Sequence, residues 1–112
     1  MILRNTTRDT ILARNLFFAK TLWEKARGLI GNSRPCTLAL KTRWGIHTFG
    51  MQFPIDVLIC DDALRVKVVR CNMKHCSFFF WNPKYSLVFE LPVGALKESG
   101  TEKGDQLEII SL

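Results

Sequence analysis

The stretch HTFGMQFPIDV, from His47 to Val57, combines an imidazole and a carboxylate with aromatic and aliphatic side chains. Histidine changes charge near neutral pH, so His47 could serve as an acid, a base or a ligand. A Cys–His nucleophile would also need a thiolate, and Cys36 and Cys60 are the candidates. The chain contains no GxSxG, HExxH, P-loop or GxGxxG motif. The sequence therefore favours a protein that is not an enzyme, with an unrecognised hydrolase that uses His47 as an alternative.

Asp56 is the residue of this stretch that most needs a partner. It precedes the run VLIC, which is apolar enough to be covered on both faces of a strand. An ionised carboxylate left unpaired in a protein interior costs several kcal/mol. The candidate donors are Arg27, His47 and backbone amides. We favour Arg27, because a guanidinium can hold a carboxylate with two hydrogen bonds and so lock a helix to the sheet.

The same stretch also has the composition of a pocket wall. With the period of two of a strand, alternate residues from His47 to Phe53 project to one side, and Trp44 would lie at the mouth. An apolar wall with one polar orienting group is typical of a small-ligand site. The alternative is that these aromatics form the core of a small barrel. The predicted ligand-binding residues are Arg27, Trp44, His47, Phe49, Met51, Phe53 and Asp56.

The cysteines predict neither disulfides nor a metal site. Cys36, Cys60, Cys71 and Cys76 contain no CxxC pair, so reduced thiols are expected. The segment CNMKHC offers soft ligands, but zinc sites normally take four ligands at better-defined spacing. We therefore predict no metal and no cofactor.

Charge is unevenly distributed along the chain, whose formal net charge is +6. Residues 1–56 are rich in Lys and Arg, whereas the acidic residues dominate from Glu90 onward. A nucleic-acid-binding protein is therefore an alternative, in which cations contact phosphates and Trp44 stacks on a base. We rank it below the pocket, because the chain has no recognised OB, helix-turn-helix or RNP motif. The cations concerned are Arg4, Arg8, Arg14, Lys41 and Arg43.

Four successive aromatic residues, Phe78, Phe79, Phe80 and Trp81, indicate a further contact surface. In an extended segment they cannot all point inward. Some must be exposed or covered by another molecule, and exposed aromatic area commonly marks an interface. We predict self-association or a protein partner at this segment.

The elements that position these residues are mostly strands. Strands are predicted over residues 9–20, 36–41, 86–92 and 107–110, with a hairpin over 55–71 that turns at Asp61–Ala63. Thr21 and Glu24 form a capping box for a short helix ending at Gly31, and one further helical turn follows Gly94. The prediction is a mainly β (α+β) fold: a small antiparallel β-barrel or paired sheets with two short helices.

Residues 1–112 are expected to form a single domain, because the length suits one core and no linker or repeat divides the chain. The apolar runs are far shorter than the roughly 20 residues of a spanning helix, and the N-terminal segment lacks an apolar h-region. A cytoplasmic location without a membrane span is the expectation.

Four motifs, ARGLIG, HTFGMQFPIDVLICD, LVFELPVGALKESG and KGDQL, resemble those of the family called domain of unknown function 192, over about residues 10–110. The resemblance implies a small bacterial or archaeal β-rich domain of unestablished biochemical role, whose members are often exported. With the pocket reading it suggests a small-ligand-binding or accessory interaction module. The matching positions are Arg27, Gly28, Leu29, residues 47–56, Asp61, Glu90, Leu91, Gly94, Gly104 and Asp105.

Overall fold

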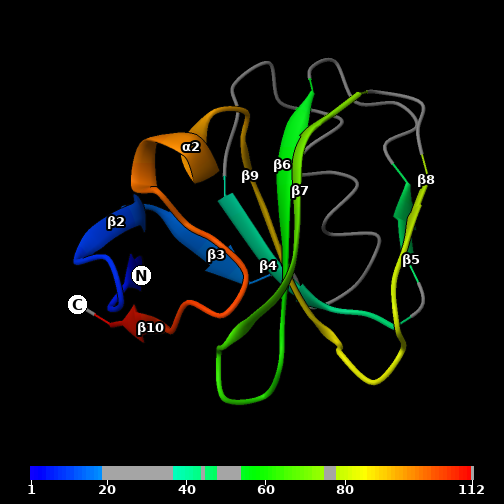
Figure 1. Ribbon diagram of the computed structural model, residues 1–112, viewed down its shortest axis with the longest axis horizontal. Coiled ribbons are helices and arrows are strands. Elements are labelled where there is room, and N and C mark those ends of the chain that lie inside the picture. The colour runs from blue at the N-terminus through cyan, green and yellow to red at the C-terminus, as the bar shows by residue number, and fades with distance from the viewer. Residues whose placement is uncertain (19–36, 44, 48–53, 75–77, 112) are drawn as a thin grey trace.

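The centre of the molecule is a five-stranded sheet with the strand order β3-β4-β9-β6-β7. The computed structural model describes residues 1–18, 37–43, 45–47, 54–74 and 78–111 (Figure 1), without the side chain of residue 47. All neighbours in the sheet are antiparallel except β3 and β4, which are parallel. Its strands are β3 (Leu16–Phe18), β4 (Thr37–Lys41), β6 (Ile55–Cys60), β7 (Val66–Met73) and β9 (Leu87–Pro92).

One face of this sheet is covered by a second sheet and a short helix. The second sheet has the order β10-β1-β2, and the helix α2 follows β9 directly (Figure 1). These elements are β1 (Ile2–Asn5), β2 (Thr10–Ala13), β10 (Leu107–Ile110) and α2 (Ala95–Ser99). Between the two layers lies the first core, formed by Leu3, Leu12, Ala13, Leu16, Ala39, Leu58, Cys60, Val66, Leu87, Phe89, Leu91, Leu96 and Leu107.

The opposite face carries the aromatic ribbon, which is the antiparallel pair of β5 (Gly45–His47) and β8 (Phe78–Phe80). It contributes to a second core, which consists of Leu38, Leu40, Ile46, Ile55, Val57, Ile59, Met73, Trp81 and Val88. Strands β6 and β9 are buried along their length because successive side chains enter the two cores in turn. This is why their sequences are almost continuously apolar.

The hairpin of β6 and β7 turns where the sequence predicts it. Oδ1 of Asp61 accepts hydrogen bonds from the amides of Ala63 and Arg65, both at 2.9 Å. The Arg65 amide is the main reason why the pKa of Asp61 lies below its ordinary value; burial opposes this effect, and the Ala63 amide adds to it. Leu64 closes the turn with a φ of 64°.

Several predicted elements are confirmed. The strands predicted at 36–41, 86–92 and 107–110 correspond to β4, β9 and β10, although residue 36 lies outside the described residues, and the 55–71 hairpin and the helical turn after Gly94 also form. The predicted first helix, over 21–31, lies outside the described residues. The mainly β fold is correct, and the paired-sheet alternative is the closer of the two architectures.

Two predictions of the fold were wrong. The described strands form three separate sheets and not a closed barrel. The single strand expected over 9–20 is broken at Arg14–Asn15, and its two parts, β2 and β3, belong to different sheets. The segment around Phe79, treated above as extended, forms strand β8. The additional strand β1 was not predicted.

A buried polar network ties the two ends of the chain together. Nδ2 of Asn5 donates to Oγ1 of Thr101 (3.0 Å) and to Oδ2 of Asp105 (2.9 Å). Nε of Arg8 and the amide of Glu102 also donate to that Asp105 oxygen, at 3.1 and 3.0 Å. Burial opposes the ionisation of Asp105, but these hydrogen bonds outweigh it and lower the pKa of this carboxyl. The network holds the 101–105 turn against β1.

Because the pKa of Asp105 is lowered on folding, its contribution to stability is complete above the ordinary aspartate pKa of about 4 and is lost as the pH falls through the lower folded value. Asp105→Asn should therefore lower the free energy of unfolding most at about pH 6, and the difference from the parent should shrink below about pH 4. Urea unfolding across this range measures it. A difference that does not change with pH would contradict the assignment.

Candidate functional site

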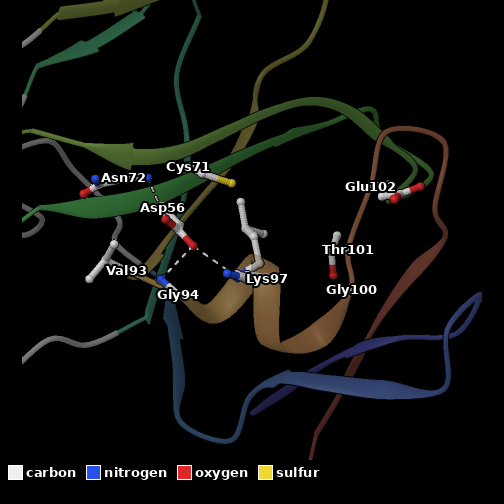
Figure 2. A pocket seen from close by; sticks show the side chains of 10 residues that line it. Asp56, Cys71, Asn72, Val93, Gly94, Lys97, Gly100, Thr101 and Glu102 are labelled. Atoms are coloured by element: carbon white, nitrogen blue, oxygen red, sulfur yellow. Dashed lines mark hydrogen bonds between the residues drawn. The ribbon is translucent and has the colours of Figure 1, made fainter.

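Asp56 is buried on the face of the central sheet that carries α2, with only 1% of its surface exposed. Its carboxylate accepts three backbone hydrogen bonds (Figure 2). The amide of Asn72 donates to Oδ1 at 2.8 Å, and the amides of Gly94 and Leu96 donate to Oδ2, both at 3.1 Å. The carboxylate therefore links β6, β7 and the start of α2. Of the donors considered from the sequence, backbone amides are the ones observed.

The helix α2 depends on Asp56 for its N-terminal cap. The first amides of a helix have no partner within the helix and carry a partial positive charge. The N-cap residue of α2 is Gly94, which has a φ of 96° and no side chain that could accept these amides. The Asp56 carboxylate supplies the acceptor from a neighbouring strand. This arrangement explains why a strand with an otherwise apolar sequence contains an aspartate.

On the other side of Asp56, Asn72 has a φ of 52° within β7. The register between β6 and β7 shifts between Ile55 and Val57, directly opposite this residue. A positive φ is uncommon outside glycine, and asparagine tolerates it better than most residues. The amide of Asn72 points at Asp56 as a result of this irregularity. The carboxylate and the bulge therefore stabilise each other.

Beside Asp56 the surface is hollowed into a cavity of about 580 Å³, here called the α2 groove. It lies between β7, α2 and the turn that follows α2, and Figure 2 shows most of its side chains. Its lining residues are Asp56, Cys71, Asn72, Val93, Gly94, Leu96, Lys97, Gly100, Thr101 and Glu102. The groove combines an apolar floor with charged and polar groups.

Both described thiols have a raised pKa. Burial is the main cause for Cys71, and the negative charge of Asp56 adds to it. Burial raises the pKa of Cys60 to about 12, with a smaller contribution from Asp61. Both are free cysteines, and only Cys71 is exposed. A nucleophilic role requires a thiolate, and a raised pKa disfavours the thiolate at neutral pH, so neither environment favours a nucleophilic role.

Most of the ligand-binding residues predicted from the sequence lie outside the described residues: Arg27, Trp44, Phe49, Met51 and Phe53. The Arg27–Asp56 ion pair therefore stays a prediction, as does a wall over residues 47–56. The backbone of His47 pairs with Phe78 in the aromatic ribbon, and its side chain is not among those described. A hydrolase that uses His47 likewise stays a prediction.

The structure places Asp56 and the strand that contains His47 on different faces of the central sheet. Asp56 bonds to α2 above the first core, whereas Ile46 packs with Val57 and Ile59 in the second core. Asp56 was predicted as part of a pocket, and it does line one, but the other described lining residues come from β7, α2 and the turns beside α2.

Sequence reasoning did not identify Cys71, Asn72, Lys97, Thr101 or Glu102 as partners of Asp56 in one cavity. The available signal was Gly94, which has no side chain that could accept the first amides of the helical turn predicted after it. These residues are 15 to 46 positions from Asp56 along the chain. Their proximity depends on the pairing of β6 with both β7 and β9.

The arginines proposed for nucleic-acid binding are partly engaged by acidic residues. Nη1 of Arg4 contacts Glu108 at 3.0 Å, and Arg4 also pairs with Asp9. Nη2 of Arg8 contacts Glu102 at 2.8 Å. The basic and acidic halves of the sequence therefore meet in space, which weakens the case for a phosphate-binding face at this end.

The described part of the chain shows neither a group of metal ligands nor a membrane-spanning helix. No three His, Cys, Asp or Glu side chains within it are grouped as metal ligands would be. His75 and Cys76 of the CNMKHC segment lie outside it. No helix within it is long and apolar enough to cross a lipid bilayer.

Replacing Asp56 with Asn should destabilise the protein by about 2–4 kcal/mol, because an amide cannot accept all three hydrogen bonds as a carboxylate does. Asp62→Asn, at an exposed position of the β6–β7 turn, is the matched control and should change stability by less than about 0.5 kcal/mol. Urea unfolding compares them. Equal effects of the two substitutions would refute the capping role.

The predicted ion pair is tested by a double-mutant cycle of Asp56→Asn with Arg27→Ala. If Arg27 also contacts Asp56, the two losses should be coupled by about 1 kcal/mol or more. Strict additivity in the free energies of unfolding would reject the pair.

Cys71 should react with iodoacetamide more slowly than a cysteine in an unstructured peptide near pH 7.5, because its raised pKa reduces the thiolate fraction. Its rate should rise as the pH increases, and Cys60 should stay unmodified while the protein is folded. Peptide mass spectrometry after timed alkylation measures both sites separately. Rapid labelling of Cys71 at neutral pH would contradict this environment.

The fold occurs in other proteins of low sequence similarity. A crystal structure of a protein of unknown function from Novosphingobium aromaticivorans matches with a TM-score of 0.77 and 16% identity, over 96% of this chain and 82% of that one. A putative transcription regulator from Sinorhizobium meliloti matches with a TM-score of 0.78 and 17% identity, over 96% and 89%. At these identities the similarity concerns the fold alone.

No curated protein sequence is significantly similar to this chain. The sequence model of the family DUF192, described as "Uncharacterized ACR", matches residues 3–109. This match agrees with the motifs around Asp56, Glu90 and Gly104, and it spans nearly the whole chain. The protein is a member of the DUF192 family, a β-rich domain without an assigned biochemical function.

Proposed function

We propose that this protein is a small-ligand-binding module and that the α2 groove is its binding site. The observation that carries the proposal is the groove itself, because its volume of about 580 Å³ falls within the range typical of small-molecule sites. Such sites combine an apolar surface with a few polar groups that orient the ligand. Val93 and Leu96 supply the apolar surface, and the polar groups come from Cys71, Lys97 and Thr101.

The charges around the groove favour a ligand with an apolar body and one anionic group. Glu102 is paired with Arg8, and the Asp56 carboxylate accepts three amides. Lys97 is exposed on the helix that forms one wall, so it offers a cation to a carboxylate or phosphate. A compact organic acid or phosphate ester matches this distribution.

The walls of the groove are joined to one another by hydrogen bonds, which supports binding without a large loss of conformational freedom. Asp56 holds β7 and α2 together, and the Ser99–Thr101–Asn5 hydrogen bonds fix the turn at the far end. A cytoplasmic location is part of the proposal, because the groove is lined by the free thiol of Cys71 and reduced cysteines are typical of that compartment.

The proposal predicts that small organic acids or phosphate esters shift the NMR signals of the Asn72, Gly94 and Leu96 amides. Lys97→Gln should weaken binding about tenfold by removing the charge-assisted contact. The matched control is Lys103→Gln, at an exposed residue that does not line the groove, and it should bind as the parent does.

A second variant, Cys71→Trp, should abolish binding by filling the groove while β7 accepts the aromatic residue. Its circular dichroism spectrum should match that of the parent. The proposal fails if no compound of such a panel shifts these amides at millimolar concentration, or if the shifts persist in folded Cys71→Trp.

A further inference from the structure

The aromatic ribbon presents two phenylalanine rings to solvent. Phe78 and Phe80 are 57% and 68% exposed. Their ring centroids are 5.9 Å apart and the rings are inclined by only 11°, so they form one stacked surface. Exposing this much aromatic area costs free energy in water, and a contiguous exposed apolar surface commonly marks a contact site.

The alternate residues of the same segment anchor the ribbon to the molecule. Phe79 packs against the second core, and Trp81 is buried with its Nε1 donating to the carbonyl of Tyr85 at 2.7 Å. Arg70 lies over the ring of Phe79, 5.6 Å from its centroid. The strand period therefore directs one pair of aromatics inward and the other pair outward. Of the four residues predicted as a contact surface, Phe78 and Phe80 are the exposed ones.

The ring of Phe80 also packs against β5. Phe80 pairs with Gly45 of β5, and a Cβ atom at that position would lie 2.6 Å from Cδ1 of Phe80. The ring therefore lies against the glycine backbone, where any larger residue would displace it. Phe80 therefore projects from a position packed against β5, with the ring of Phe78 stacked beside it.

The charge around the ribbon is positive. Residues 63–89 contain five Lys or Arg and no Asp or Glu. Around the ribbon the exposed cations include Arg70, Lys84 and Arg43, the last of which donates to the carbonyl of Pro83 at 2.8 Å without losing its charge. One acidic residue, Asp62, lines a hollow with Arg43. The acid-rich turn and helix around α2 and β10 lie at the opposite end of the molecule (Figure 1).

We propose that the aromatic ribbon docks on an anionic lipid surface, with Phe78 and Phe80 entering the interface and the surrounding cations contacting headgroups. Peripheral membrane binding grows with the apolar area inserted and with the attraction between basic residues and anionic lipids. A projecting ring pair suits a lipid interface, whereas small-molecule and peptide sites are concave. Phe78 and Phe80 line neither the α2 groove nor the hollow beside Arg43.

A second copy of this chain is a poorer occupant of the ribbon. In a two-fold interface the same surface meets itself, so the cations around one ribbon would face those around the other. An anionic partner removes this repulsion. The ribbon lies on the face of the central sheet opposite the α2 groove, so the proposal does not depend on ligand binding there.

Sedimentation with vesicles tests the proposal. The full chain should bind vesicles of phosphatidylcholine with about 30% phosphatidylserine and not pure phosphatidylcholine, and raising NaCl from about 0.1 to about 0.5 M should release it. The double variant Phe78→Ser/Phe80→Ser should bind at least about tenfold more weakly, because the inserted apolar area is lost.

The matched control is Phe17→Ser/Phe18→Ser, which removes two other exposed phenylalanines, on β3. This variant should bind anionic vesicles as the parent does, and circular dichroism should show that both variants are folded. The proposal is overturned if the parent does not bind anionic vesicles, or if the two double variants bind equally. A parent that dimerises through Phe78 and Phe80 by light scattering, without binding vesicles, also overturns it.

Discussion

The buried carboxylate of Asp56 is the interaction on which the arrangement of this domain depends. A charge in a protein interior is tolerated only when its hydrogen-bonding capacity is satisfied. Here the donors are three backbone amides from the β7 bulge, the β9–α2 turn and the first turn of α2. Each of these segments has an amide that regular secondary structure leaves without a partner. The Asp56 carboxylate thus provides an acceptor for all three of these amides. The α2 groove forms where the three segments meet.

The central sheet separates two surfaces of different chemistry. On one face, α2 and the β1-β2-β10 sheet bring the acidic turn of residues 101–105 against Arg8, so charges there are largely paired. On the other face, the aromatic ribbon carries exposed phenylalanines among cations. Under the two proposals above, the module would bind a small molecule on one face and an anionic lipid surface on the other.

Glu90 shows how completely the sheet is enclosed. It is fully buried in β9, where its Cα pairs with Leu38 of β4 and Val57 of β6, and it shares the face of the second core. Asp56 and Glu90 therefore place carboxylates on the two faces of one sheet. Acidic residues within strands that are otherwise apolar are costly, and both residues lie in the sequence motifs that resemble those of DUF192. For Asp56, the three backbone amides that donate to its carboxylate explain why an acidic residue occupies this buried position.

The accuracy of the sequence predictions differed between elements for physical reasons. The β6–β7 hairpin was predictable because Asp61 is a turn former between two β-branched runs. The break between β2 and β3 at Arg14–Asn15 was not, since neither glycine nor proline marks it. Strand β8 has aromatic residues at every position and so lacks the polar alternation that identifies a half-buried strand. The alternation in β8 is between exposed and partly buried side chains, and it appears only in the folded structure.

From the sequence alone came the mainly β fold, the family, the order of most strands along the chain and the need for Asp56 to find donors. These depend on local propensity, turn chemistry and the cost of burying a charge, all of which are properties of neighbouring residues. The tertiary structure decided which donors Asp56 found, which residues line the groove and which aromatics face solvent. Those outcomes depend on contacts between segments up to about 46 residues apart in sequence, whose meeting is set by strand pairing and register.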